Sequence, residues 1–82
     1  MAVTEPAQQL AETVREQWGR NVLARRHEAG LTQAALAERA GVGQGTVAKI
    51  EQGRAWPSDL LKVKIAWALG SRPGQLWNWD RS

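Results

Sequence analysis

Residues 33–52 read QAALAERAGVGQGTVAKIEQ, and this stretch decides the fold. Apolar and small residues recur there at helical spacing on both sides of Gly41, in segments long enough only for short helices. A glycine at this place supplies the tight geometry that turns the chain. The apolar side chains then share one inner face: Leu36, Ala40, Val42, Val47 and Ile50. The stretch therefore predicts two helices joined by a tight turn, with Ala37 kept small where the second helix crosses it.

The segment before this pair predicts one long helix. Thr4 caps its start ahead of Glu5 and Pro6, and the helical pattern continues to His27 and ends at Gly30. Apolar side chains recur every fourth residue on one stripe: Leu10, Val14, Trp18 and Val22. We therefore expect residues 1–17 to be an N-terminal extension of the first helix, ahead of a domain over residues 18–82.

Glycine and proline divide the remainder into short helices. Thr32 caps the helix that ends at Gly41, a third helix is expected over residues 44–52, and a fourth over residues 59–69 after Pro57. A last short turn runs over residues 73–77. Since no run of alternating β-branched residues predicts a strand, the expected fold is all-α, a compact bundle of about five helices.

The fourth helix has two apolar faces. One carries Leu61, Ile65, Ala68 and Leu69, and the other carries Leu60, Val63 and Trp67. One face belongs to the core, so the other must be covered by the long first helix or by another protein chain. Trp18 and Trp67 lie on apolar stripes and are expected to be buried, whereas Trp77 and Trp79 are candidates for a dimer contact.

Composition excludes several classes of function. The chain has 82 residues, no cysteine and one histidine, which predicts a single domain without a disulfide, metal site or cofactor. No nucleophile and base stand at a catalytic spacing, so an enzyme is not expected. No apolar run is long enough for a membrane span and the first residues do not form a signal peptide, which indicates a cytoplasmic protein.

Positive charge is concentrated after the first segment. The chain carries a net charge of +3, yet residues 1–17 carry −2, because Arg15 stands against Glu5, Glu12 and Glu16. The excess of arginine and lysine therefore begins where the paired helices begin, a placement that favours an anionic partner for that part of the chain.

These residues resemble a known family. The run LTQAALAERAGVGQGTVAKIEQGR, followed by WPS and AWALGSRPGQL, is similar to the Cro and phage-repressor (Xre-type) helix-turn-helix domains over residues 18–77. The resemblance implies a lambda-repressor-like bundle whose helix-turn-helix occupies residues 33–52. It also implies binding to double-stranded operator DNA and control of transcription as the outcome.

The resemblance assigns roles by position. Gln44, Thr46 and Lys49 stand where family members touch the major groove, glutamine suiting adenine and lysine suiting guanine, although Thr46 could equally reach a phosphate. The positions implied to contact phosphates are Thr32, Gln33, Gln52, Arg54 and Arg26. Arg26 and Glu51 occupy positions that in many relatives form an internal ion pair.

The sequence also departs from the family pattern. Gly43 replaces the usual Ser or Thr cap of the recognition helix, and Gly45 lies within its first turn at a cost of about 1 kcal/mol relative to alanine. With Ala48 they leave few side chains to read bases. Specificity therefore leans on DNA shape, on close approach of the backbone, or on a second contact element.

The leading interpretation is a small Cro or immunity-type repressor of a phage or prophage that acts by occupying its operator. The alternative is an antitoxin that binds a protein toxin and represses its own operon, with the acidic first segment as its protein-binding arm. A restriction-modification controller shares the first mechanism and is not separated from it by sequence. The expected partners are operator DNA and a second copy in a weak homodimer, with no membrane and no small-molecule ligand.

Overall fold

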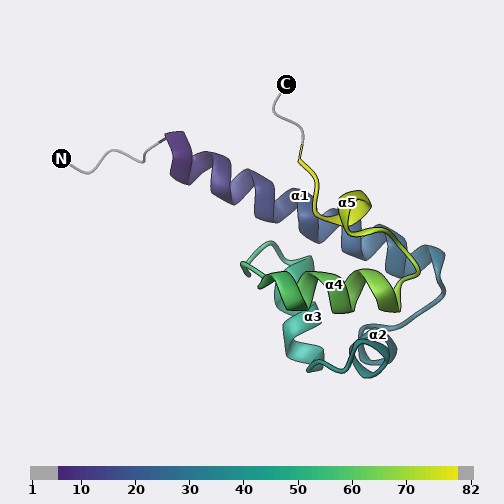
Figure 1. Ribbon diagram of the computed structural model, residues 1–82. Coiled ribbons are helices and arrows are strands. Elements are labelled where there is room, and N and C mark those ends of the chain that lie inside the picture. Colours follow the sequence, from purple (N-terminus) through teal and green to yellow (C-terminus); the bar gives the residue numbers. More distant parts are fainter. Residues whose placement is uncertain (1–5, 80–82) are drawn as a thin grey trace.

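The computed structural model describes residues 6–79, and within that range it is all-helical, as predicted. Its helices, labelled in Figure 1, are α1 (Pro6–Glu28), α2 (Gln33–Ala40), α3 (Gln44–Glu51), α4 (Asp59–Ala68) and α5 (Pro73–Leu76). The predicted cap at Thr4 lies outside the described residues. Because α1 is continuous, the expected N-terminal extension and the domain that follows it share one helix. Among residues 6–79 no helix is both long and apolar enough to cross a membrane.

Local chemistry fixes the helix ends within one or two residues of the predicted positions. The backbone N–H of Ala35 donates to Thr32 Oγ1 (3.0 Å), and that of Leu61 donates to Ser58 Oγ (3.2 Å), so both caps satisfy an amide that the helix leaves open. Gly41 adopts the left-handed conformation (φ 71°) that ends α2 and turns the chain into α3.

All five helices contribute to one core. The largest fully buried side chains are Val22 from α1, Leu36 from α2, Val47 and Ile50 from α3, Ile65 from α4, and Leu76 from α5. Each such side chain stabilises the fold by about 1.5–3 kcal/mol through burial alone. The long α1 and the short α2 and α3 are therefore held as one unit, with α2 and α3 at the end of the molecule opposite the start of α1 (Figure 1).

Tryptophans form a second cluster between α1 and α4. Trp18 is buried, as predicted, and meets Trp56 and Trp77 edge-on, with ring centroids 5.4 and 5.7 Å apart. Trp77 Nε1 donates to the carbonyl of Lys62 (3.0 Å), which ties the C-terminal residues to α4. Edge-to-face pairs of this kind add about 0.5–1.5 kcal/mol beyond their burial. The cluster thus joins α1, α4 and the segment after α5.

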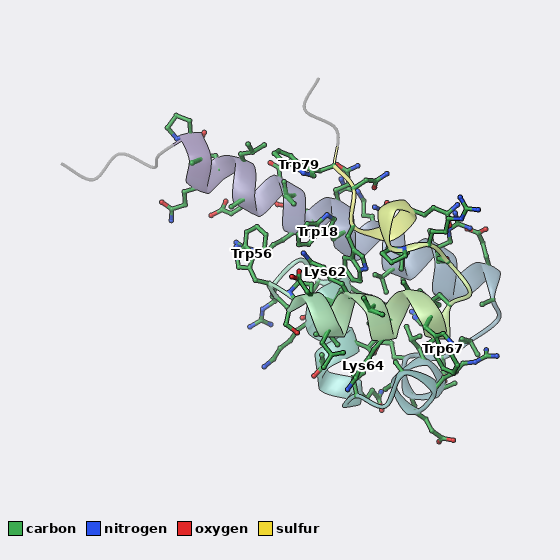
Figure 2. All side chains as sticks on the ribbon, viewed as in Figure 1. Trp18, Trp56, Lys62, Lys64, Trp67 and Trp79 are labelled. Carbon is green, nitrogen blue, oxygen red and sulfur yellow. The ribbon has the colours of Figure 1, made fainter. Side chains whose placement is uncertain are left out.

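Trp67 is not buried, and that prediction was wrong. Its side chain is 72% exposed and lies on the outer surface of α4 (Figure 2). The apolar stripe of α4 that packs inward contains Ile65 and Ala68, as expected, whereas Leu60 and Val63 share the exposed surface with Trp67. α1 does not cover this surface either. The expectation that the long first helix covers this surface is therefore wrong for the described residues.

Candidate functional site

The turn between α2 and α3 presents one face of α3 to solvent. Val47 and Ile50 anchor the helix in the core, so the opposite side of the helix points outward. Gln44 and Lys49 are exposed, and Thr46 is half-buried. The three residues predicted to read bases therefore lie on α3 with two of them fully available to a partner.

A buried ion pair fixes the end of α3 to α1. Arg26 Nε lies 2.6 Å from Glu51 Oε2, and Arg26 Nη2 donates to Glu51 Oε1 at 3.1 Å, which makes the contact bidentate. The hydrogen bond with Glu51 raises the pKa of Arg26 above its ordinary value against the opposing effect of burial. The predicted partners thus meet, and they hold α3 at a fixed angle to α1.

The structure corrects the phosphate role that the sequence assigned to Arg26. The residue is only 8% exposed, and its Nη1 donates to the carbonyl of Leu31 (2.8 Å) while the other edge binds Glu51. A guanidinium enclosed in this way is not presented to a phosphate. Arg26 therefore belongs to the framework of the site and not to its surface.

Gln33 extends this network to the start of α2. Its Nε2 donates to Glu51 Oε1 (3.0 Å), which orients the amide group at the helix N-terminus. An amide nitrogen has two hydrogens, so one remains for a phosphate oxygen. The neighbouring Thr32 uses its hydroxyl oxygen to cap α2, leaving its hydroxyl hydrogen as a donor. The start of α2 thus combines oriented side-chain donors with the positive end of a helix dipole.

A second group of donors follows α3. Gln52 and Arg54 are both exposed, and Arg54 Nη1 donates to Gln52 Oε1 at 3.3 Å. The contact brings the two predicted phosphate ligands together and leaves the Gln52 amide hydrogens available. Because Gln33 contacts Glu51, the last residue of α3, both groups of donors lie beside that end of the helix.

Glycine leaves the first turn of α3 bare. Gly43 is the N-cap and supplies no side-chain cap, and an alanine methyl at Gly45 would meet nothing within 4 Å. Neither packing nor a positive φ requires glycine at position 45. The backbone of α3 is consequently more accessible here than it would be with any other residue.

The two residues predicted as dimer contacts differ in their surroundings. Trp77 is half-buried in the tryptophan cluster, whereas Trp79 is 39% exposed and lines a groove beside α1. The larger exposed apolar surface is instead on α4.

Sequence reasoning missed the contact that sets α1 against α3. Gly19 lies where a Cβ atom would be 2.5 Å from the carbonyl oxygen of Ile50 and 2.6 Å from that of Glu51. The available signal was a glycine inside a long helical pattern, which often marks a close backbone approach. The spacing alone did not show which segment approaches.

A comparison with protein families matches residues 22–76 to the helix-turn-helix family HTH_3. An uncharacterized HTH-type transcriptional regulator of Methanothermobacter thermautotrophicus is 53% identical over 45 residues. That match covers 55% of this chain and 65% of the relative, so the chain spans just under two thirds of its length.

Solved structures with the same fold include two bacterial regulators. The restriction-modification controller protein C.AhdI from Aeromonas hydrophila is 29% identical with a TM-score of 0.74, covering 76% of this chain and 94% of that one. The clp gene regulator ClgR from Corynebacterium glutamicum is 30% identical with a TM-score of 0.73, covering 77% and 67%. Both similarities span about three quarters of this chain.

Proposed function

Since the chain belongs to the helix-turn-helix family HTH_3, we propose that it is a transcription regulator that binds double-stranded DNA in a sequence-specific manner. The finer proposal is a small Cro or immunity-type repressor of phage or prophage origin that acts in the cytoplasm by occupying its operator. The related regulators named above support the general class.

One observation carries the proposal: the exposed face of α3 adjoins two groups of hydrogen-bond donors and is held in place by a buried bidentate ion pair. The Arg26–Glu51 contact fixes α3 and, through Glu51, orients Gln33. Such preorganised donors match the phosphates that flank a major groove, which an α-helix can enter.

The proposed contacts divide by chemistry. Gln44 and Lys49 read base edges, since glutamine pairs well with adenine and lysine with guanine. Thr46 contributes to the same face. Gln33 and Arg54 hold phosphates on either side and set the register of the helix in the groove. Thr32 and Gln52 support these two ends.

A selection of bound sequences from a random pool of DNA duplexes tests the proposal. We expect the bound pool to converge on a short motif, and affinity for that motif to fall steeply with salt, by about 0.9 in the log–log slope for each phosphate neutralised. A pool that stays random, or an affinity that does not change between low and moderate salt, would contradict sequence-specific DNA binding.

We propose further that the regulator binds its operator as a homodimer joined through the outer face of α4. Leu60, Val63 and Trp67 are all more than half exposed on one side of this helix. Two copies crossing antiparallel about a two-fold axis near Val63 place Leu60 of one copy against Trp67 of the other, a contact that closes on itself. Pairing of half-sites one helical turn apart raises the affinity of so small a domain.

The alternative proposal is an antitoxin, and the same surface is the observation that favours it. An exposed apolar face of this size would equally receive a protein toxin. The composition of the DNA complex separates the two: one protein on a site without two-fold symmetry leaves α4 free for a different protein. Genes beside the coding sequence give a second test, an integrase favouring the phage repressor and a small toxin favouring the antitoxin. A restriction-modification controller, like C.AhdI, would give the same result as the phage repressor in the DNA complex.

A further inference from the structure

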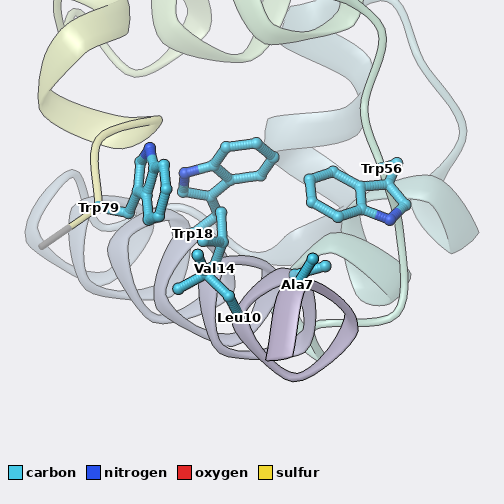
Figure 3. Close-up of a pocket in the computed structure, with 7 residues that line it drawn as sticks. Ala7, Leu10, Val14, Trp18, Trp56 and Trp79 are labelled. Carbon is cyan, nitrogen blue, oxygen red and sulfur yellow. The ribbon is translucent and has the colours of Figure 1, made fainter. Parts of the chain in front are cut away.

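A groove beside the first turns of α1 is not used by the proposed DNA interface. Its volume is about 320 Å³, and it lies between α1, the loop that follows α3 and the residues after α5 (Figure 3). The lining is almost entirely apolar and consists of Ala7, Leu10, Ala11, Val14, Trp18, Trp56 and Trp79. The volume is at the lower end of the range found for small-molecule sites.

One polar atom in this apolar lining lacks a partner. Trp18 is only 6% exposed, and its Nε1 is buried without a hydrogen-bond acceptor among the described residues. Trp77, in the same cluster, satisfies its own Nε1 with the carbonyl of Lys62. Buried donors are nearly always paired, because an unpaired one costs about 1–3 kcal/mol. The Trp18 N–H is therefore an orphan donor in the groove.

The aromatic walls of the groove suit a planar apolar group. Trp56 forms one wall and is 55% exposed, although the guanidinium of Arg15 lies 5.1 Å from its ring centroid and Trp18 contacts it edge-on. Trp79 lies on the opposite side, the side toward which the Trp18 ring nitrogen is directed in Figure 3. Two aromatic rings held apart in this way can each stack on or meet a third ring edge-on.

We propose that this groove binds a small aromatic molecule that carries one hydrogen-bond acceptor, such as a carbonyl or carboxylate oxygen. The ring lies between Trp56 and Trp79, and the acceptor receives the N–H of Trp18, with a shift of the Trp79 ring that gives access to the nitrogen. The site goes beyond DNA binding and does not depend on it. It also differs from the sequence expectation, which included no small-molecule ligand.

Charge and shape favour this ligand over a cationic or purely aliphatic one. Among residues 6–79 no carboxylate lines the groove, and two cations flank it: Arg15 over Trp56 and Lys62 Nζ, 4.6 Å from the centroid of Trp18. A cationic ligand would be repelled by both, whereas a neutral or anionic acceptor would not. An aliphatic ligand would leave the Trp18 donor unpaired.

The test titrates the full chain with three probes that share one ring system: 2-acetonaphthone, 2-naphthoate and naphthalene. Heteronuclear NMR of the tryptophan indole N–H groups follows each side chain separately. We expect the ketone and the carboxylate to bind about threefold to tenfold more tightly than naphthalene, the gain of one hydrogen bond. Only these two probes should move the Trp18 signal downfield. The Trp79 signal should also shift, while that of the distant, exposed Trp67 stays in place.

Ala11→Leu fills the groove from its α1 wall and should abolish binding of all three probes. Ala24→Leu makes the same change at an exposed position of the same helix, outside the groove, and should leave binding unchanged. If Ala11→Leu fails to fold, Ala7→Leu provides the same test at an exposed position of the lining.

Three results would overturn the proposal. The first is an indole N–H signal of Trp18 that does not move at a millimolar concentration of the ketone or the carboxylate. The second is equal affinity for naphthalene and the ketone, which removes the role of the N–H donor. The third is a change of the Trp56 and Trp79 signals with protein concentration alone, which makes the groove a contact between copies. A Trp18→Phe variant that folds should bind naphthalene and the ketone equally.

Discussion

Gly19 of α1 lies directly against the main chain of Ile50 in α3, so close that a Cβ atom on Gly19 would be 2.5 Å from the Ile50 carbonyl oxygen. Real Cβ atoms do not approach a backbone oxygen to this distance. The absence of a side chain at position 19 therefore allows α1 and α3 to cross, and this crossing sets the angle at which α3 is presented.

Gly19→Ala should destabilise the protein although alanine is the better helix former. Relief of the clash requires α1 and α3 to separate, and overpacking of this kind costs about 1–3 kcal/mol. In a domain of this size, thermal unfolding should shift downward by roughly 4–8 °C for each kcal/mol. A melting temperature equal to or above that of the parent would show that the helices do not meet here.

Gly45→Ala is the matched substitution for Gly19→Ala, at a helical glycine whose added methyl group would have no atom close to it. It should raise the free energy of unfolding by about 1 kcal/mol, because glycine is costly inside a helix and the site is open. Operator affinity should nevertheless fall by about tenfold, or ~1.4 kcal/mol, since the added methyl group stands on the bare turn that we propose approaches DNA. Chemical denaturation and DNA titration measure the two effects. Unchanged affinity would place DNA away from this turn.

Arg26→Ala should cost about 3–5 kcal/mol of stability, because it leaves the carboxylate of Glu51 buried without its partner. Glu51→Ala and the double variant complete a cycle that isolates the pair. The double variant should be more stable than Arg26→Ala alone, since it removes the unpaired charge. If the two single effects simply add, the bidentate contact contributes no coupling energy in solution.

Much of the fold could be predicted because local signals determine it. The cap at Thr32 and the left-handed Gly41 act within a few residues, so sequence spacing reveals them. The Arg26–Glu51 pair came from family resemblance, and the same resemblance misplaced Arg26 at a phosphate, because burial depends on segments distant in sequence. Trp67 shows the same limit: its apolar spacing matched a core stripe, but two apolar faces on one helix cannot both face a single core.

The base and phosphate contacts of the site stay predictions that depend on a partner. Lys49→Ala should relax preference at one or two operator positions and cost about 1–3 kcal/mol for the preferred sequence, whereas Gln33→Ala should weaken all sequences nearly equally. The two residues lie on different helices, one on the exposed face of α3 and one at the start of α2. Competition among variant duplexes measures both. Equal loss on every duplex for both variants would contradict the assignment of Lys49 as a reader.

The outer face of α4 yields the last prediction, on assembly. Trp67→Lys should leave the fold intact, because the side chain is 72% exposed and contributes nothing to the core cluster. It should also abolish cooperative binding to a two-fold symmetric operator, since it places a charge against Leu60 of the other copy in the proposed contact.

Ala24→Lys is the matched control, because it adds the same charge at an exposed residue of α1 and not of α4, and it should retain cooperativity. Sedimentation of the free protein and of its DNA complex counts the copies bound. Two copies of the parent and one of Trp67→Lys on each operator are expected. If the variant still binds as a pair, the dimer contact lies elsewhere, and Trp79 becomes the residue to change next, because it is the exposed member of the C-terminal pair that the sequence indicated.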